Sequence, residues 1–394
     1  MSRFSRKSES RLNVSNIFNE NENGGSAVSG ISTFSSPHYF VPPSGTTAER
    51  PSNPGEGMIR FNTDSGHLEY YRGDHWADII TNNNEVGVST FAAGISAAGT
   101  GTRALFFAGA TPVNQNVIQY LSIPTFGNAA DFGDCSASAK QGNTALSSSV
   151  RAVSGGGYAP AITDEMEFVT VASTGDSADF GNLSVGRAQF ASLASTTRGI
   201  FAGGYTNVGG ASNKDTIDYI TIASKGSAED FGNVGYGERH NTIACANSVR
   251  GIVAGGANNI STIDYLTIST TGNSQTFGDL TVGRGAAGGC SNSIRGLFAG
   301  GMDPAVVANG PTDFITIATT GNAQDFGDIS AKGYLAAAAS STRAVFAGGL
   351  APGSSVVNAI ESMEIVSTGN AVDFGTLLDT VNTFGGCSNG HGGL

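Results

Sequence analysis

An Asp-Phe-Gly triplet recurs along this 394-residue chain, and one isolated copy would be a candidate for metal chemistry. In phosphate-transferring enzymes such an aspartate binds magnesium, but those enzymes also need a glycine-rich phosphate loop, and this sequence has none. Repetition instead predicts a packing role, in which phenylalanine fills the space between repeats, glycine makes a turn and aspartate accepts backbone hydrogen bonds. The triplets begin at Asp131, Asp179, Asp230, Asp325 and Asp373, and Thr276 replaces the aspartate in a sixth copy.

A second set of carboxylates recurs where we predict the third strand of each repeat. These groups could line a channel and bind cations. The interpretation that we favour is that each is satisfied within a strand or turn and pairs with a recurring arginine, because buried polar groups need partners. The residues are Glu167, Asp218, Asp264, Asp313 and Glu361.

Other catalytic chemistry has little support in the sequence. The five histidines lack metal-ligand spacing with cysteine or acidic residues, apart from the weak pair His67 and His75. A nucleophile elbow, a zinc-protease helix and a phosphate loop are all missing from the sequence. We therefore predict that the protein is not an enzyme and uses no metal and no cofactor. A polysaccharide-cleaving enzyme remains an alternative, since it needs only two carboxylates.

The elements that would position these residues repeat six times. Each repeat has an arginine, a hydrophobic strand and a glycine pair, and successive arginines are 48, 47, 52, 45 and 48 residues apart. Each repeat also carries four strand signals, and four short strands in about 48 residues are typical of one β-propeller blade. The repeat arginines are Arg103, Arg151, Arg198, Arg250, Arg295 and Arg343.

The two ends of the repeat region predict a closed ring. The pattern of the first strand occurs at 91–96, before the first repeat arginine, and again at 382–387, after the last repeat. One of these copies can complete a six-bladed ring with strands from both ends, which removes exposed edges. A seven-bladed ring is the alternative, and which terminal strand closes the ring stays open at this point.

The repeats diverge between the glycine pair and the third strand. Scaffold residues repeat because every blade must stack, whereas these loops are free to differ, and equivalent loops emerge on one face of a propeller. We predict that this face binds a ligand, with tyrosines that stack on a sugar and polar side chains that bond it. The candidate residues are Tyr158, Tyr205, Asn213, Asn258 and Asp303.

Composition excludes several classes of function. The net charge is -12 and only 13% of residues are charged, so we expect no nucleic-acid binding, which needs clustered lysine and arginine. No apolar run approaches the length of a membrane span, so no membrane insertion is expected. The N-terminus lacks a secretory signal, which predicts synthesis in a cytoplasm. Cys245, Cys290 and Cys387 share one small apolar repeat position, which predicts free buried thiols.

The first part of the chain differs from the repeats. Residues 1–35 are rich in Ser, Asn and Glu, so we predict a flexible docking segment that is disordered alone. Residues 36–82 read as a small β-module with a hairpin of 58–62 and 67–71 and a third strand that contains Trp76. So small a unit needs oligomerisation or docking for support. Residues 83–394 form the predicted propeller.

The repeat resembles kelch-type propeller repeats. Those carry a diglycine, then an aromatic residue, a tryptophan and an arginine before the next blade. In one repeat Gly203-Gly204, Tyr219, Phe231 and Arg239 match in that order, and the next repeat matches likewise, although phenylalanine stands in place of the tryptophan. The resemblance covers about three quarters of the chain and supports an all-β, six-bladed, kelch-like β-propeller; it says little about function.

The N-terminal module is similar to a short module of tail-fibre and other structural proteins of tailed bacteriophages. The matching stretches are 45–51, 54–63 and 68–76, which contain an Arg-Pro, a Gly-Met-Ile-Arg-Phe-Asn-Thr and a closing Trp76. Propellers with Phe-Ala-Gly-Gly repeats behind such modules resemble virion proteins of phages that infect marine cyanobacteria.

These resemblances imply a virion protein in a tail or neck fibre, or on the capsid surface. Other virion proteins would bind residues 1–82, and a host-surface glycan or protein would bind the propeller loops. A homo-oligomer is expected, with a trimer as one candidate form. The alternative is a capsid-decorating or purely structural appendage protein that binds no receptor.

Overall fold

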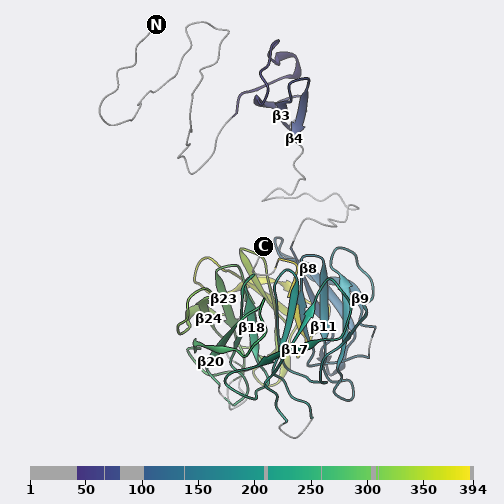
Figure 1. Cartoon of the computed structure of the whole chain (residues 1–394), viewed down its shortest axis with the longest axis vertical. Coiled ribbons are helices and arrows are strands. Elements are labelled where there is room, and N and C mark those ends of the chain that lie inside the picture. Colours follow the sequence, from purple (N-terminus) through teal and green to yellow (C-terminus); the bar gives the residue numbers. More distant parts are fainter. Residues whose placement is uncertain are drawn as a thin grey trace, which may run out of the picture. The chain divides into compact units, whose positions relative to one another are not determined.

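The computed structural model describes residues 42–65, 67–79, 102–136, 138–207, 212–258, 260–302, 308 and 310–390 (Figure 1). The chain divides into two compact units, Met1–Val88 and Ser89–Leu394. The described part is all-β, as predicted, apart from one short 3-10 helix, η1 (Thr47–Glu49). No helix in these ranges is long and apolar enough to cross a bilayer. The predicted segment 1–35, the boundary at 82/83 and the strand pattern at 91–96 lie outside the described residues.

The first unit contains a four-stranded sheet in the order β1-β2-β3-β4. Strands β2 (Ile59–Asn62) and β3 (His67–Tyr71) are antiparallel and stand where the sequence predicts the hairpin. Strand β4 (Trp76–Ile79) is antiparallel to β3, and the short β1 (Ser44–Gly45) runs parallel to β2.

One face of this sheet is held by charge rather than by a hydrophobic core. The Glu69 side chain is fully buried, and its carboxylate accepts hydrogen bonds from Arg50 and Asn62. Arg60 lies 3.6 Å from the same carboxylate. The ring centre of Trp76 lies 5.9 Å from the Arg50 guanidinium and 6.0 Å from that of Arg60.

The opposite face of the sheet is apolar. Ile59 pairs with Tyr70 and Phe61 pairs with Leu68, so all four side chains project to the same side. Ile59 is 52% exposed. We call these four residues the apolar face of the first unit.

The second unit contains six four-stranded sheets within its described residues. In each sheet the first, second, third and fourth strands of one repeat lie side by side in that order. Within every sheet, neighbouring strands are antiparallel. Three sheets are β10 (Thr144–Ser147), β11 (Arg151–Gly155), β12 (Glu165–Thr170), β13 (Ala178–Asn182); β14 (Ala191–Ala194), β15 (Arg198–Ala202), β16 (Thr216–Thr221), β17 (Glu229–Asn233); and β18 (Ile243–Ala246), β19 (Arg250–Ala254), β20 (Thr262–Thr267), β21 (Gln275–Asp279). The other three are β22 (Gly288–Ser291), β23 (Arg295–Ala299), β24 (Pro311–Thr316), β25 (Gln324–Asp328); β26 (Ala336–Ala339), β27 (Arg343–Ala347), β30 (Ala359–Glu364), β31 (Val372–Thr376); and β32 (Gly385–Ser388), β5 (Arg103–Phe107), β8 (Val117–Ser122), β9 (Ala130–Asp134). The loops after two of the second strands contain short hairpins. These are β6 (Ala110–Thr111) with β7 (Val113–Asn114), and β28 (Leu350–Ala351) with β29 (Ser355–Val356).

The Asp-Phe-Gly triplets join neighbouring sheets, as their repetition predicts. Phe180 is buried, and its carbonyl accepts a hydrogen bond from the amide of Gly226 in the next sheet. A Cβ atom on Gly181 would stand only 2.4 Å from the Gly226 carbonyl oxygen, so only glycine allows this approach. The same contact recurs from each sheet to the next, including from Gly375 in β31 to Gly127 in the sheet of β5.

The repeat arginines also clasp adjacent sheets. Each guanidinium packs over an aromatic ring and donates a hydrogen bond to a backbone carbonyl of the following sheet. Arg198, for example, lies 4.4 Å from the Tyr219 ring centre and donates to the Ile268 carbonyl at 3.0 Å. Arg343 makes the equivalent bond to Ile123, 220 residues earlier in the chain.

The C-terminal strand completes the sheet that begins with the first repeat arginine. Strand β32 pairs with β5, from Gly385 opposite Phe107 to Ser388 opposite Ala104. Asn389 bonds the backbone of Arg103 just as Asn247 bonds Arg250 within a continuous chain: the backbone amide of the arginine donates to the Asn389 side chain at 2.7 Å. Of the two terminal patterns seen in the sequence, the one at 382–387 therefore fills this position.

Candidate functional site

The recurring carboxylates of the third strands are buried in ion pairs, but with other partners than the sequence suggested. A β-bulge stands at each carboxylate; in β16 it lets Asp218 and the preceding Ile217 both be buried. The cation comes from the residue that precedes each first strand by a few positions, not from a repeat arginine, so that predicted pairing was wrong. The pairs are Lys140–Glu167 at 2.5 Å, Arg187–Asp218 at 2.9 Å, Arg284–Asp313 at 3.2 Å, Lys332–Glu361 at 2.8 Å, and Arg239–Asp264.

The sixth sheet, which contains β32, β5, β8 and β9, has neither the cation nor the carboxylate. Val381 stands where the other sheets have the cation, and Gln119 stands where they have the carboxylate. Gln119 still accepts a hydrogen bond from the Leu378 amide at 2.8 Å, as Asp218 does from Ser184. The sixth sheet therefore lacks the cation and the carboxylate together, so at this position it buries no charge without a partner.

Burial weakens the charged forms within these pairs. It lowers the pKa of Arg239 and raises the pKa of its partner Asp264, and each shift is opposed by the charge of the other residue. Burial likewise lowers the pKa of Lys332 against the opposing effect of Glu361. A cation with its carboxylate in contact is the arrangement that offsets this desolvation.

Metal chemistry has no site in the described ranges, where no three His, Cys, Asp or Glu side chains are placed to hold an ion. The four cysteines are free and buried, which confirms the prediction for the thiols. Burial raises the pKa of Cys290 to about 12, so that thiol is not a nucleophile at neutral pH.

The sheets of the second unit have two different ends. At one end the second strand leads into the variable loop, and the fourth strand crosses to the next sheet; we call this the loop face, and it carries Tyr158 and Tyr205. The opposite end, the turn face, carries the short turns before the repeat arginines, such as that at Val150. The described part of the unit begins at Thr102 and ends at Gly390, and both residues lie on the turn face beside Arg103.

A ring of six backbone hydrogen bonds lies on the loop face. Each sheet contributes one residue just before its first strand, and the amide of each donates to the carbonyl of the preceding member at 2.7–2.9 Å. The ring closes because Gly142 donates to Thr383. All six members have φ between 53° and 69°. They are Gly142, Gln189, Asn241, Ala286, Tyr334 and Thr383.

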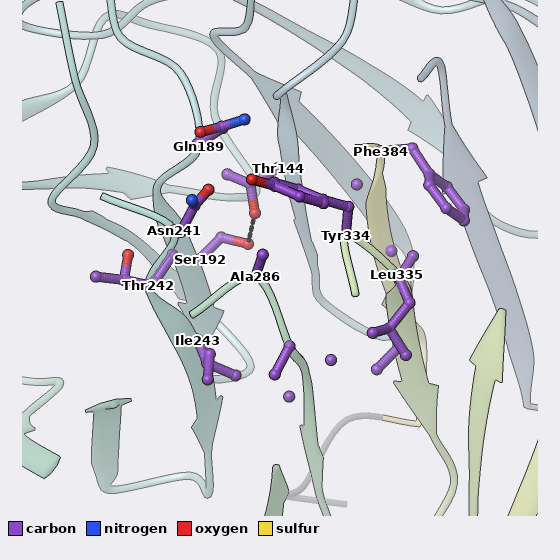
Figure 2. A pocket seen from close by; sticks show the side chains of 18 of the residues that line it. Thr144, Gln189, Ser192, Asn241, Thr242, Ile243, Ala286, Tyr334, Leu335 and Phe384 are labelled. Carbon is purple, nitrogen blue, oxygen red and sulfur yellow. Dashed lines mark hydrogen bonds between the residues drawn. The ribbon is translucent and has the colours of Figure 1, made fainter. Parts of the chain in front are cut away.

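The hydrogen-bonded ring surrounds a cavity of about 120 Å³, which we call the mouth cavity. Figure 2 shows Tyr334 extended across it from one side, with Gln189 and Asn241 on the other side. The Thr144 and Ser192 hydroxyls are 2.5 Å apart in its wall. The described residues that line it include no Asp, Glu, Lys or Arg.

Both predicted loop tyrosines stand next to this cavity, although neither is among the residues that line it. Tyr158 pairs with Gln141 and Tyr205 pairs with Ala188, so each joins the backbone next to a ring member. The Tyr205 ring packs edge-on against His240, with ring centres 5.5 Å apart. Burial raises the pKa of Tyr205, with smaller effects from Tyr334 and Tyr158.

The remaining predicted residues are less closely connected. Asn213 forms a backbone bridge with Tyr205, which places it beside the tyrosines. Asn258 is exposed in its own loop with φ 66° and is not among the residues lining the mouth cavity. Asp303 lies outside the described residues.

Sequence reasoning missed Tyr334, His240, Gln189 and Asn241. A signal for three of them was present, because Gln189, Asn241 and Tyr334 each stand nine residues before a repeat arginine, at 198, 250 and 343. The residue at this position varies from glycine to tyrosine, so no shared residue type identifies it from repeat to repeat. Burial lowers the pKa of His240, which is therefore neutral at physiological pH.

The mouth cavity and the residues beside it thus present uncharged aromatic, amide and hydroxyl groups. Comparison with known protein families gives no matching family model, and comparison with curated proteins gives no significant match.

Proposed function

We propose that the second unit is a six-bladed, kelch-like β-propeller whose blades are the six sheets. Three sets of contacts that run from sheet to sheet and return to the start support this proposal. They are the Asp-Phe-Gly contacts, the arginine clasps and the ring of six hydrogen bonds. Strand β32 from the C-terminus then closes the first blade, so the propeller has no free inner strand.

We propose that the protein is a phage virion protein in a tail or neck fibre and that its loop face recognises the host surface. One observation carries the second part: both chain ends of the propeller lie on the turn face, while the variable loops, Tyr158 and Tyr205 lie on the opposite face. A chain tethered at the turn face leaves the loop face free to meet a ligand.

Residues 1–82 bind other virion proteins in this proposal. The apolar face of the first unit supports it, because a small sheet with an ion-paired interior gains stability when its apolar side is covered by another surface. The same face is suited to a homo-oligomer, for which a trimer is one candidate form.

The proposed function is binding, not catalysis. The third-strand carboxylates that a glycosidase would use are buried in ion pairs, and the described lining of the mouth cavity is free of acidic residues. A capsid-decorating or purely structural appendage is the second candidate.

Adsorption of the full chain to host cells distinguishes the two candidates. Tyr205→Ala should reduce adsorption about tenfold, because an aromatic anchor is lost, and should change the melting temperature little. The matched control is Val150→Ala on the turn face, where the side chain is 62% exposed. Unchanged adsorption for Tyr158→Ala, Tyr205→Ala and Asn258→Ala together would favour the structural appendage.

A further inference from the structure

Resting on the proposed function, we propose that the mouth cavity is a carbohydrate site that takes an uncharged sugar unit of a surface glycan, with Tyr334 as its stacking wall. The sequence directs attention to the variable loops. The structure directs it to the hydrogen-bonded ring at their centre, which is assembled from all six sheets.

The conformation of Tyr334 is the first argument. Its φ of 53° lies in the left-handed region, which is energetically costly for a non-glycine residue. The ring needs only a backbone amide and carbonyl from this position, and Gly142 supplies both without that cost. A large aromatic side chain here is therefore not required by the scaffold.

The position of the Tyr334 side chain is the second argument. The aromatic ring of Tyr334 crosses the mouth cavity, and this residue is only partly exposed (Figure 2). Gln189 stands three members away around the six-membered ring, on the far side of the cavity. An aromatic face opposite a primary amide offers an apolar surface and polar groups within one cavity. A sugar ring needs both, because its C–H face is apolar and its rim consists of hydroxyl groups.

Charge supports an uncharged ligand. Among the described residues lining the cavity, the Gln189 and Asn241 amides can donate and accept. The Thr144 and Ser192 hydroxyls can accept, since Ser192 donates its proton to the Ala145 carbonyl and Thr144 bonds Ser192. A carboxylate or phosphate would enter without a cation to pair it, and that desolvation is costly. A quaternary ammonium would need several facing aromatic rings, whereas the other aromatic residues of the described lining, Phe190 and Phe384, are buried and leave Tyr334 as the one partly exposed aromatic ring there.

The rim offers places for adjoining sugar units. Tyr205 and His240 form an edge-on aromatic pair next to the cavity, and both are uncharged at neutral pH. Tyr158 stands beside a second ring member, Gly142, through its bridge to Gln141. A chain of sugars that leaves the mouth cavity therefore meets aromatic surface on the loop face.

The test is saturation-transfer NMR and calorimetry on the full chain. The probes are methyl glycosides of neutral hexoses and N-acetylhexosamines, the neutral polysaccharide fraction of the host envelope, a glucuronide and choline. We expect binding of a neutral probe and weaker binding of the glucuronide and of choline. Tyr334→Ala should lower the affinity about tenfold, whereas Tyr334→Phe, which keeps the aromatic face, should stay within about threefold of the natural chain.

The control is Tyr236→Ala, because Tyr236 is 57% exposed and does not line the cavity. Equal binding by Tyr334→Ala and the natural chain, or no binding of any neutral probe, would overturn the inference, as would a preference for choline. Host-cell adsorption separates this result from the proposed function. If adsorption persists with Tyr334→Ala and in excess neutral sugar, host recognition stands but does not use this site. If the chain binds sugar but does not adsorb to host cells, the sugar site stands and the proposed host recognition fails.

Discussion

At the scale of single residues, the molecule is organised by contacts that pass from one sheet to the next. Contacts within each sheet recur as well, and the Arg239–Asp264 ion pair is one of them, buried beside the glycine pair of its own sheet. The natural replacement of such a pair by Val381 and Gln119 shows that the site accepts an uncharged combination. Removal of one partner alone is a different change, because it leaves a buried charge without compensation.

This difference gives a prediction for the free energy of unfolding. Arg239→Val should destabilise the chain by about 3–5 kcal/mol, because the Asp264 carboxylate stays buried without its cation. The double variant Arg239→Val with Asp264→Gln copies the sixth sheet and should recover more than half of that loss. Urea unfolding of the two variants measures both values. A double variant that is less stable than the single one would show that the ion pair has a role the sixth sheet does without.

Residue identity also explains what could be predicted from the sequence. The partners of the carboxylates were misassigned because the repeat arginines recur at the most regular intervals in the sequence. Spacing along the chain does not reveal which cation lies next to each carboxylate in space. The joint loss at Val381 and Gln119 is visible in the sequence and would have identified the correct pairs. The mouth cavity was out of reach, because Gln189 and Tyr334 meet there only through closure of the ring.

At the scale of elements, the strands themselves were predictable. Each repeat has short alternating segments bounded by glycine turns, and the structure places four strands in each of the six sheets. The sequence left two strand patterns competing for the position beside β5. Pairing between residues 282 positions apart resolves this, because Cys387 stands opposite Leu105 and Asn389 repeats the turn contact of Asn247.

Strand β32 should therefore be essential for cooperative unfolding. Truncation after Thr380 removes β32 together with Phe384 and Cys387, which are buried, and leaves β5 as an unpaired edge. We expect a loss of more than about 4 kcal/mol and a broader urea transition. Truncation after Gly390 is the control and should change neither. A shortened chain that unfolds at the same urea concentration as the full one would contradict closure by β32.

At the scale of the whole molecule, the two units have different surfaces and different expected partners. The first unit has an ion-paired interior around Glu69 and an apolar face that includes Ile59. The second unit has its chain ends on the turn face and Tyr158 and Tyr205 on the loop face. This separation is the basis on which we propose attachment by residues 1–82 and recognition by the loop face.

The measurement that tests the central claim most directly is immunogold labelling of purified virions with an antibody to residues 103–394. The account predicts label at the tail or neck, and loss of that label from particles assembled with a chain that lacks residues 1–82. Label spread over the capsid would favour decoration in place of a fibre. Intact particles without label would contradict the assignment of this protein to the virion.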